Sequence, residues 1–217
     1  MKHTEKELTA LKDEVSQMWR LVLSQLEKVK QAFTANNIEL AREVVSREKR
    51  VNSFELKIDS DCENYIALYN PVAIDLRLVL SLSKICGTLE RIADFAEGIA
   101  RHVIEEREQS ELIENLRAET MFDTVIEMLS NSYVVLDSEN TKLSGKILAM
   151  DNEVDEIYRN AVAVLAEAIR NNVISAENGL KTMLVIRKIE RIGDHCSNIV
   201  EEIVFYIDAK VLKHQDS

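Results

Sequence analysis

Apolar residues recur at spacings of three and four over most of the chain, the pattern expected of long amphipathic helices. Polar or proline-containing breaks divide this pattern into six segments, and no segment shows the alternation of a half-buried strand. The predicted helices run from Thr4 or Thr9 to Phe33, over 38–68, from Pro71 to Arg101, over 111–136, from Ile147 to Ile169, and from Ser175 to Tyr206. The pattern therefore predicts an all-α protein whose helices pack along continuous apolar stripes.

One short segment of the chain occurs twice. Residues 89–94 read LERIAD and residues 189–194 read IERIGD, and both lie inside a predicted helix. Self-similarity of this kind is the sign of an internal duplication. Because long helices joined by short turns pack most simply as antiparallel bundles, the sequence predicts two tandem three-helix bundles, over 1–105 and 106–217.

Acidic residues follow one edge of the apolar stripe in each repeated segment. Glu90 and Asp94 are four residues apart, so one helical turn stacks their carboxylates on the same face. The small residue before each Asp, Ala93 or Gly193, leaves room for another helix or an ion to come close. Similar rows occur on a second helix of each half. The rows comprise Glu48, Asn52, Glu55, Asp59, Glu90, Asp94, Glu97 and Arg101 in the first half, and Asp151, Asp155, Glu190, Asp194 and Glu201 in the second.

If these rows converge between helices, repulsion and desolvation require a cation or an arginine partner. Arg91 and Arg191 lie about 100° round the helix from the neighbouring Glu, on the side away from the apolar stripe. We therefore expect them to neutralise the rows poorly, which favours a metal ion. Oxygen ligands suit Mg, Ca, Mn or non-haem iron, and carboxylates also bind zinc. A single acidic pair would be read as solvated surface, and its repetition on two pairs of helices leaves a converging site and a solvated surface about equally open.

Composition and charge exclude several other classes of protein. The formal net charge of −11 argues against nonspecific binding to nucleic acid or to an anionic membrane surface. The amino end lacks a signal-peptide segment, and no uncharged apolar run approaches the ~20 residues of a membrane crossing. The three cysteines form no C-x-x-C pair, which is typical of buried thiols in a reducing cytoplasm.

The sequence offers no catalytic constellation. It has no nucleophile elbow, no Gly-rich phosphate loop and no Walker motif, and the Glu-x-x-His of ferritin-like di-iron bundles is missing. His102 lies at a helix end and His195 points away from Asp194, so no histidine ligand to the rows is expected. We therefore expect a protein that is not an enzyme.

At these residues the chain resembles the PhoU family, the accessory regulators of phosphate-specific transport in bacteria. The resemblance rests on the two E-R-I-(A/G)-D segments, on residues 71–79 (PVAIDLRLV), on Val51-Asn52 and Val154-Asp155 in the two middle helices, and on residues 191–196 (RIGDHC). It covers nearly the whole chain, and the motifs are specific when taken together.

The resemblance implies two PhoU-type bundles related by a pseudo-twofold axis, in a cytoplasmic protein. It also implies binding to the ATPase subunit of the phosphate ABC transporter and to the sensor histidine kinase of the phosphate regulon. Such proteins restrain both uptake and signalling when phosphate is plentiful. Contact with a membrane would come only through these partners, and a homodimer is expected.

Some members of the family carry multinuclear iron or zinc clusters, and the resemblance implies metal on the acidic rows here. Carried over by position, the ligands are Glu48, Asn52, Glu90 and Asp94 in the first bundle, and Asp151, Asp155, Glu190 and Asp194 in the second. Asn52 stands where a charged ligand is expected. The candidates for partner binding are Asp75, Arg77, Arg91 and Arg191. The Asp-Leu-Arg segment at 75–77 has no counterpart in the second half, so the halves are expected to differ in partner binding.

Two alternatives stay open beside this hypothesis. The first is a carboxylate-bridged di-metal oxidase or hydrolase in a helical bundle, and the missing Glu-x-x-His counts against it. The second is a metal-free helical scaffold whose acidic rows are merely solvated. Elemental analysis of protein purified without a chelator would distinguish the scaffold from the two metal-binding hypotheses.

Overall fold

The computed structural model describes residues 3–106 and 116–210, and within these ranges it contains helices and turns but no strand. The long helices are α1 (His3–Thr34), α2 (Ile38–Tyr69), α3 (Ala73–Glu105), α4 (Ala118–Ser138), α5 (Ser144–Arg170) and α6 (Ala176–Asp208), and a short 3-10 helix, η2 (Thr141–Leu143), precedes α5. The all-α prediction is confirmed. The expected start of the fourth helix, at residues 111–115, lies outside the described residues.

Asparagine and serine residues set several of the helix ends. The Asn37 side chain accepts a hydrogen bond from the Leu40 amide at 3.0 Å, and Ser175 caps α6 by accepting from the Asn178 amide at 3.1 Å. Asn70 ends α2 in the left-handed conformation, with φ of 46°, which asparagine tolerates better than most residues. The helix after Pro71 begins at Ala73, two residues later than expected.

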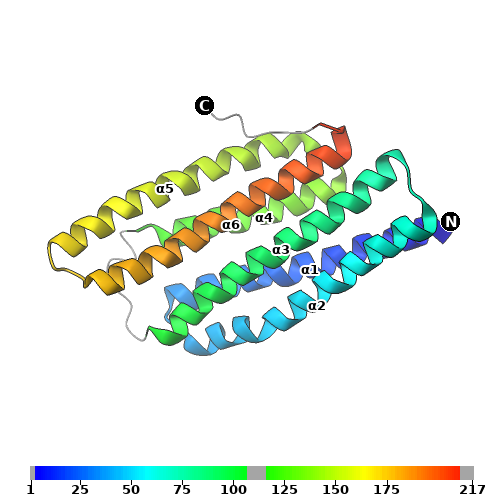
Figure 1. Cartoon of the computed structure of the whole chain (residues 1–217). Coiled ribbons are helices and arrows are strands. Elements are labelled where there is room, and N and C mark those ends of the chain that lie inside the picture. The colour runs from blue at the N-terminus through cyan, green and yellow to red at the C-terminus, as the bar shows by residue number, and fades with distance from the viewer. Residues whose placement is uncertain (1–2, 107–115, 211–217) are drawn as a thin grey trace.

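The helices form two antiparallel three-helix bundles, α1–α3 and α4–α6, which pack side by side (Figure 1). The contact between the bundles is made mainly by α3 against α6 and by α1 against α4. The turn between α2 and α3 lies at one end of the molecule, and the turn between α5 and α6 lies at the other (Figure 1). Along the described chain no helix is long and apolar enough to cross a membrane.

Equivalent positions of the two repeats meet where α3 crosses α6. The rings of Phe95 and His195 stack with centroids 5.6 Å apart and planes inclined by 23°. A contact between two positions related by the duplication is what a pseudo-twofold axis at this point requires. Polar contacts flank the stack on both sides: Ser81 Oγ donates to the Glu202 carbonyl at 3.3 Å, and Lys181 Nζ lies 2.7 Å from Glu106 Oε1. The fold thus matches the predicted duplication.

A continuous apolar core joins the two bundles. Trp19 of α1 is 1% exposed, and its indole N–H donates to the Leu129 carbonyl of α4 at 3.1 Å. Its ring lies 5.6 Å from the ring of Tyr133. Phe33 and Phe122 make a similar contact, 5.8 Å apart, farther along the same helices. The predicted division at residues 105 and 106 falls at the end of α3 and remains a prediction, since residues 107–115 lie outside the described chain.

Because Trp19 fills the space between the bundles, Trp19→Ala should lower the free energy of unfolding by about 3–5 kcal/mol. The loss combines a large cavity with a missing hydrogen bond to Leu129. Urea denaturation monitored by circular dichroism measures the change. Val134→Ala on α4 is the matched control, since Val134 is 48% exposed and its truncation should change stability by less than about 0.5 kcal/mol. A loss below about 1 kcal/mol for Trp19→Ala would contradict its role.

Candidate functional site

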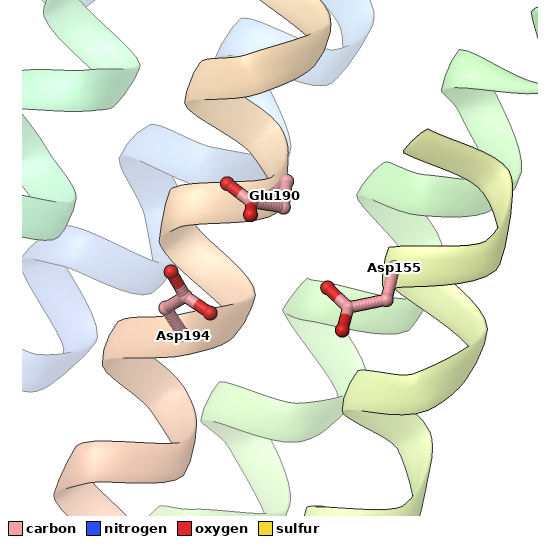
Figure 2. Close-up of side chains that lie close together, drawn as sticks. All are labelled: Asp155, Glu190 and Asp194. Atoms are coloured by element: carbon pink, nitrogen blue, oxygen red, sulfur yellow. The ribbon is translucent and has the colours of Figure 1, made fainter. Parts of the chain in front are cut away.

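Three carboxylates converge between α5 and α6 in the second repeat. Asp155, Glu190 and Asp194 each offer one oxygen atom, and the three atoms lie within 4.8 Å of one another. All three residues are half-buried. Asp155 reaches across from α5, whereas Glu190 and Asp194 project from consecutive turns of α6 (Figure 2). The predicted stacking of Glu190 on Asp194 is therefore present, and the neighbouring helix supplies a third oxygen.

The apolar seam and a glycine bring the two helices together at this place. Val154 and Ile189, which directly precede Asp155 and Glu190, are fully buried and hold each carboxylate at the rim of the core. At Gly193, a Cβ atom would lie 2.8 Å from Asp151 Oδ1, which is closer than such atoms normally approach. The absence of a side chain at Gly193 therefore allows α5 to come close, as the sequence predicted.

The fourth predicted ligand of this repeat, Asp151, lies one helical turn before Asp155. Its Oδ2 accepts a hydrogen bond from Ser197 Oγ at 2.8 Å. This bond fixes the Asp151 side chain against α6, next to Gly193. Asp151 is not a member of the group of three converging oxygens, and in this structure it serves the packing of α5 on α6.

Burial and repulsion destabilise the ionised form of the central carboxylate. Burial raises the pKa of Glu190, the neighbouring charge of Asp194 raises it further, and the guanidinium of Arg191 acts in the opposite direction. Glu190 Oε2 is buried and has no hydrogen-bond partner. An unsatisfied buried carboxylate oxygen costs free energy, and a bound cation would remove that cost.

The expectation that Arg191 neutralises this row poorly is wrong in part. Arg191 Nη1 lies 3.1 Å from Asp194 Oδ2, and Arg191 Nε lies 3.8 Å from Glu190 Oε2. The long, flexible side chain bends back over the row although its Cα faces away from the apolar seam. The Arg191 side chain remains 46% exposed, so it balances the charge from the solvent side and does not fill the space between the helices.

The first repeat arranges its predicted ligands differently. Asn52 donates a hydrogen bond from Nδ2 to Glu48 Oε1 on the same helix. Burial raises the pKa of Glu90 to about 7, and the charges of Asp94, Glu55 and Glu48 add to the rise. Burial also raises the pKa of Asp94. Within the described part of this repeat, no three histidine, cysteine or carboxylate ligand atoms come as close together as they do in the second.

Glu55 lies in the predicted acidic row but was not among the predicted ligands. Its charge raises the pKa of Glu90, and the charge of Asp94 in turn raises the pKa of Glu55, after burial and the charge of Asp59. Glu55 therefore faces the carboxylates of α3. The spacing of four, three and four residues along 48–59 places Glu55 on the same face of α2 as Glu48 and Asn52, and could have identified it.

The residues predicted to bind partners occupy varied surroundings. Asp75 and Arg91 are exposed on α3. Arg77 is half-buried, and its Nε donates to the Tyr206 carbonyl at 3.3 Å. Part of its role is therefore to tie α3 to the end of α6. Arg191 lies over the acidic row described above. Partner binding through these four residues remains a prediction.

The three converging carboxylates would suit a cation that is bound through oxygen atoms. Asp155, Glu190 and Asp194 supply only oxygen, which suits Mg, Ca, Mn, iron or zinc bound by carboxylates. The thiols of Cys62, Cys86 and Cys196 are buried, and burial raises the pKa of Cys62 to about 12, so a thiolate is disfavoured. The stack of His195 on Phe95 matches the prediction that His195 points away from the row. The residues present therefore fit a metal ion at the second repeat.

The raised pKa of Glu90 makes the stability of the metal-free protein depend on pH. The folded pKa of about 7 lies above the ordinary value of 4.5, so the cost of ionising Glu90 is absent at low pH and complete above the folded pKa. Glu90→Gln should therefore stabilise the metal-free protein by about 1 kcal/mol near pH 8, allowing for partial solvent screening, and change it little near pH 4.

Urea denaturation at both pH values measures this difference. Glu105→Gln, which removes an exposed carboxylate from the same helix, should change stability little at either pH. A Glu90→Gln variant with no gain at the higher pH would show that the carboxyl is ionised without penalty.

Sequence comparison finds the PhoU domain family twice in this chain, at residues 15–103 and 118–203. The chain is 30% identical to "Phosphate-specific transport system accessory protein PhoU homolog 1" of Thermotoga maritima, over 97% of this chain and 91% of the relative. It is 31% identical to "Phosphate-specific transport system accessory protein PhoU" of Escherichia coli, over 96% of this chain and 86% of the relative.

Solved structures show the same architecture. The crystal structure of PhoU from Pseudomonas aeruginosa superposes with a TM-score of 0.90 at 27% identity, covering 95% of this chain and 99% of that one. The phosphate transport system regulatory protein PhoU from Streptococcus pneumoniae superposes with a TM-score of 0.87 at 25% identity, covering 97% of this chain and 100% of that one. With both repeats matched and the fold shared along nearly its whole length, this chain belongs to the PhoU family.

Proposed function

We propose that this protein is an accessory regulator of phosphate-specific transport. The observation that carries the proposal is the match of both repeats to the PhoU domain, together with relatives named as accessory or regulatory proteins of phosphate transport. The shared fold includes both bundles and the contact between them. The alignments cover 91% of the Thermotoga maritima relative and 86% of the Escherichia coli relative.

The finer proposal is a cytoplasmic adaptor that contacts the ATPase subunit of the phosphate transporter and a sensor histidine kinase. In this role the protein restrains uptake and signalling when phosphate is plentiful. Long helices with exposed apolar residues support the adaptor role, since such faces suit contacts with other proteins. The exposed residues include Leu56 at 72%, Leu180 at 65% and Leu184 at 58%. A homodimer is part of the same proposal.

Metal binding is the second part of the proposal. Asp155, Glu190 and Asp194 would hold the ion, and the buried Glu190 Oε2 without a hydrogen-bond partner supports this assignment. The ion would supply positive charge that joins α5 to α6. Iron and zinc are the first candidates. The relatives are named as accessory or regulatory proteins, which favours a structural or regulatory ion over the di-metal enzyme considered above.

Deletion of the gene in the host bacterium tests the regulatory role. In phosphate-rich medium, loss of the regulator should raise alkaline phosphatase expression and phosphate uptake, because the restraint on both is removed. Expression of the wild-type chain from a plasmid should restore the low values, whereas an empty plasmid should not. Unchanged alkaline phosphatase and uptake after deletion would contradict the proposed function.

Removal of metal tests the second part. After chelation, adding back the ion at about a hundred times its Kd should stabilise the folded protein by about 2.7 kcal/mol and raise its Tm. Asp155→Asn should abolish this gain, because it removes the carboxylate that α5 contributes. Asn160→Asp, an exposed change on the same helix, should keep it. Equal Tm values with and without every ion tried would contradict metal binding.

A further inference from the structure

The two repeats place different side chains at equivalent positions of their acidic rows. On α3 and α6 the repeated segments align Glu90 with Glu190 and Asp94 with Asp194. On α2 and α5 the pairs Val51-Asn52 and Val154-Asp155 align, and both valines are fully buried. Three differences separate the two rows at these aligned positions.

The first difference is Asn52, which stands where the second repeat has the ligand Asp155. An amide offers one neutral oxygen in place of a charged pair. Its Nδ2 also donates a hydrogen bond to Glu48 Oε1, so it engages one oxygen of a second predicted ligand. The Asn52 Oδ1 atom is buried and has no hydrogen-bond partner. It is a single uncharged oxygen, so this position could offer a metal ion only one neutral ligand atom.

The second difference is the methyl group of Ala93, which stands where the second repeat has Gly193. At Gly193 the space that a methyl would need is occupied by Asp151 Oδ1, only 2.8 Å from the ideal Cβ position. Ala93 is buried, so its methyl group lies on the packed side of α3. The equivalent carboxylate of the first repeat, Glu48, therefore cannot approach the helix in the manner of Asp151.

The third difference lies C-terminal to the aligned acids on α3 and α6. Arg101 lies 2.6 Å from Glu97 Oε1 and pairs with it on the exposed side of α3. In the second repeat Ser197 stands in place of Glu97 and Glu201 in place of Arg101. Ser197 donates a hydrogen bond to Asp151. In addition, Asp94 is exposed whereas Asp194 is half-buried, so Asp94 is the more open to water of the two.

From these differences we infer that the metal site of this protein is confined to the second repeat, and that Asn52 is the main residue that keeps the first repeat from forming an equivalent one. The two bundles have thus diverged, one holding an ion and the other a metal-free acidic surface. This inference rests on the metal-binding part of the proposed function.

Metal content measured on paired variants tests the inference. The purified, chelated protein is reloaded with zinc, passed through a desalting column and analysed by inductively coupled plasma mass spectrometry, with circular dichroism to show that each variant is folded. Asp155→Asn and Glu190→Gln should each lower the amount of zinc bound per chain at least tenfold. Glu90→Gln, the equivalent change in the first repeat, should keep all of it.

A gain-of-site variant supplies the converse test. Asn52→Asp, alone or combined with Ala93→Gly, should increase the zinc retained per chain, and the extra zinc should disappear when Glu90→Gln is added. Asn160→Asp adds the same charge at an exposed place on α5 and should leave the zinc content unchanged.

Two results would overturn the inference. One is a wild-type protein whose zinc falls with Glu90→Gln as much as with Glu190→Gln, since both repeats would then hold metal. The other is a wild-type protein and an Asn52→Asp variant that both retain none. Neither result bears on phosphate regulation, which the gene deletion tests separately. A failure of this inference can therefore be distinguished from a failure of the proposed regulatory function.

Discussion

The burial of one apolar edge on α3 and on α6 determines how both helices are rotated in the bundles. Leu89 and Ile92 of α3, and Ile189 and Ile192 of α6, are all fully buried. Burying one such side chain contributes about 1.5–3 kcal/mol, whereas a like-charge pair one helical turn apart costs only about 0.2–0.5 kcal/mol on an exposed helix. Packing therefore decides the rotation of both helices, and the carboxylates take the positions that it leaves them.

Glu90 and Glu190 consequently lie at the edge of the core, where neighbouring helices bring further acids close. Neither helix can turn its carboxylates fully into water without exposing the apolar seam. Burial, and after it the charge of the neighbouring acids, raises the pKa of Glu90 and of Glu190 in the metal-free protein. A cation between Asp155, Glu190 and Asp194 would convert this cost into attraction between α5 and α6, which Gly193 already allows to approach closely.

Periodicity and duplication were sufficient to predict the architecture. The spacing of apolar residues located six helices, five of them to within a few residues at both ends, because long amphipathic stripes leave little choice of secondary structure. The fourth begins at Ala118, after a turn at 116–117, and not at 111 as predicted. The repeated E-R-I-(A/G)-D segments predicted the two bundles, and the small residue at Gly193 indicated a close approach. Each of these predictions used only the spacing of residues along a single helix.

Contacts between helices were harder to predict. The i, i+4 spacing stacks Glu190 on Asp194, but it does not determine whether Asp151 or Asp155 of α5 meets them. The structure selects Asp155, because Ser197 and Gly193 fix Asp151 one turn away. Helical-wheel geometry also misplaced the guanidinium of Arg191, since it follows Cα directions and ignores the reach of a long side chain. The pairing of Trp19 with Leu129, between the bundles, had no signal in the spacing of either helix.

Anomalous diffraction from crystals grown with zinc or iron would show whether an ion lies between α5 and α6, because one map reports the element, its position and its ligands. A metal site confined to the second repeat should give a strong anomalous peak bounded by Asp155, Glu190 and Asp194, and no peak beside Glu48, Asn52 and Glu90. Density of equal strength in both repeats, or carboxylates of the second repeat that separate into solvent with no ion between them, would contradict it.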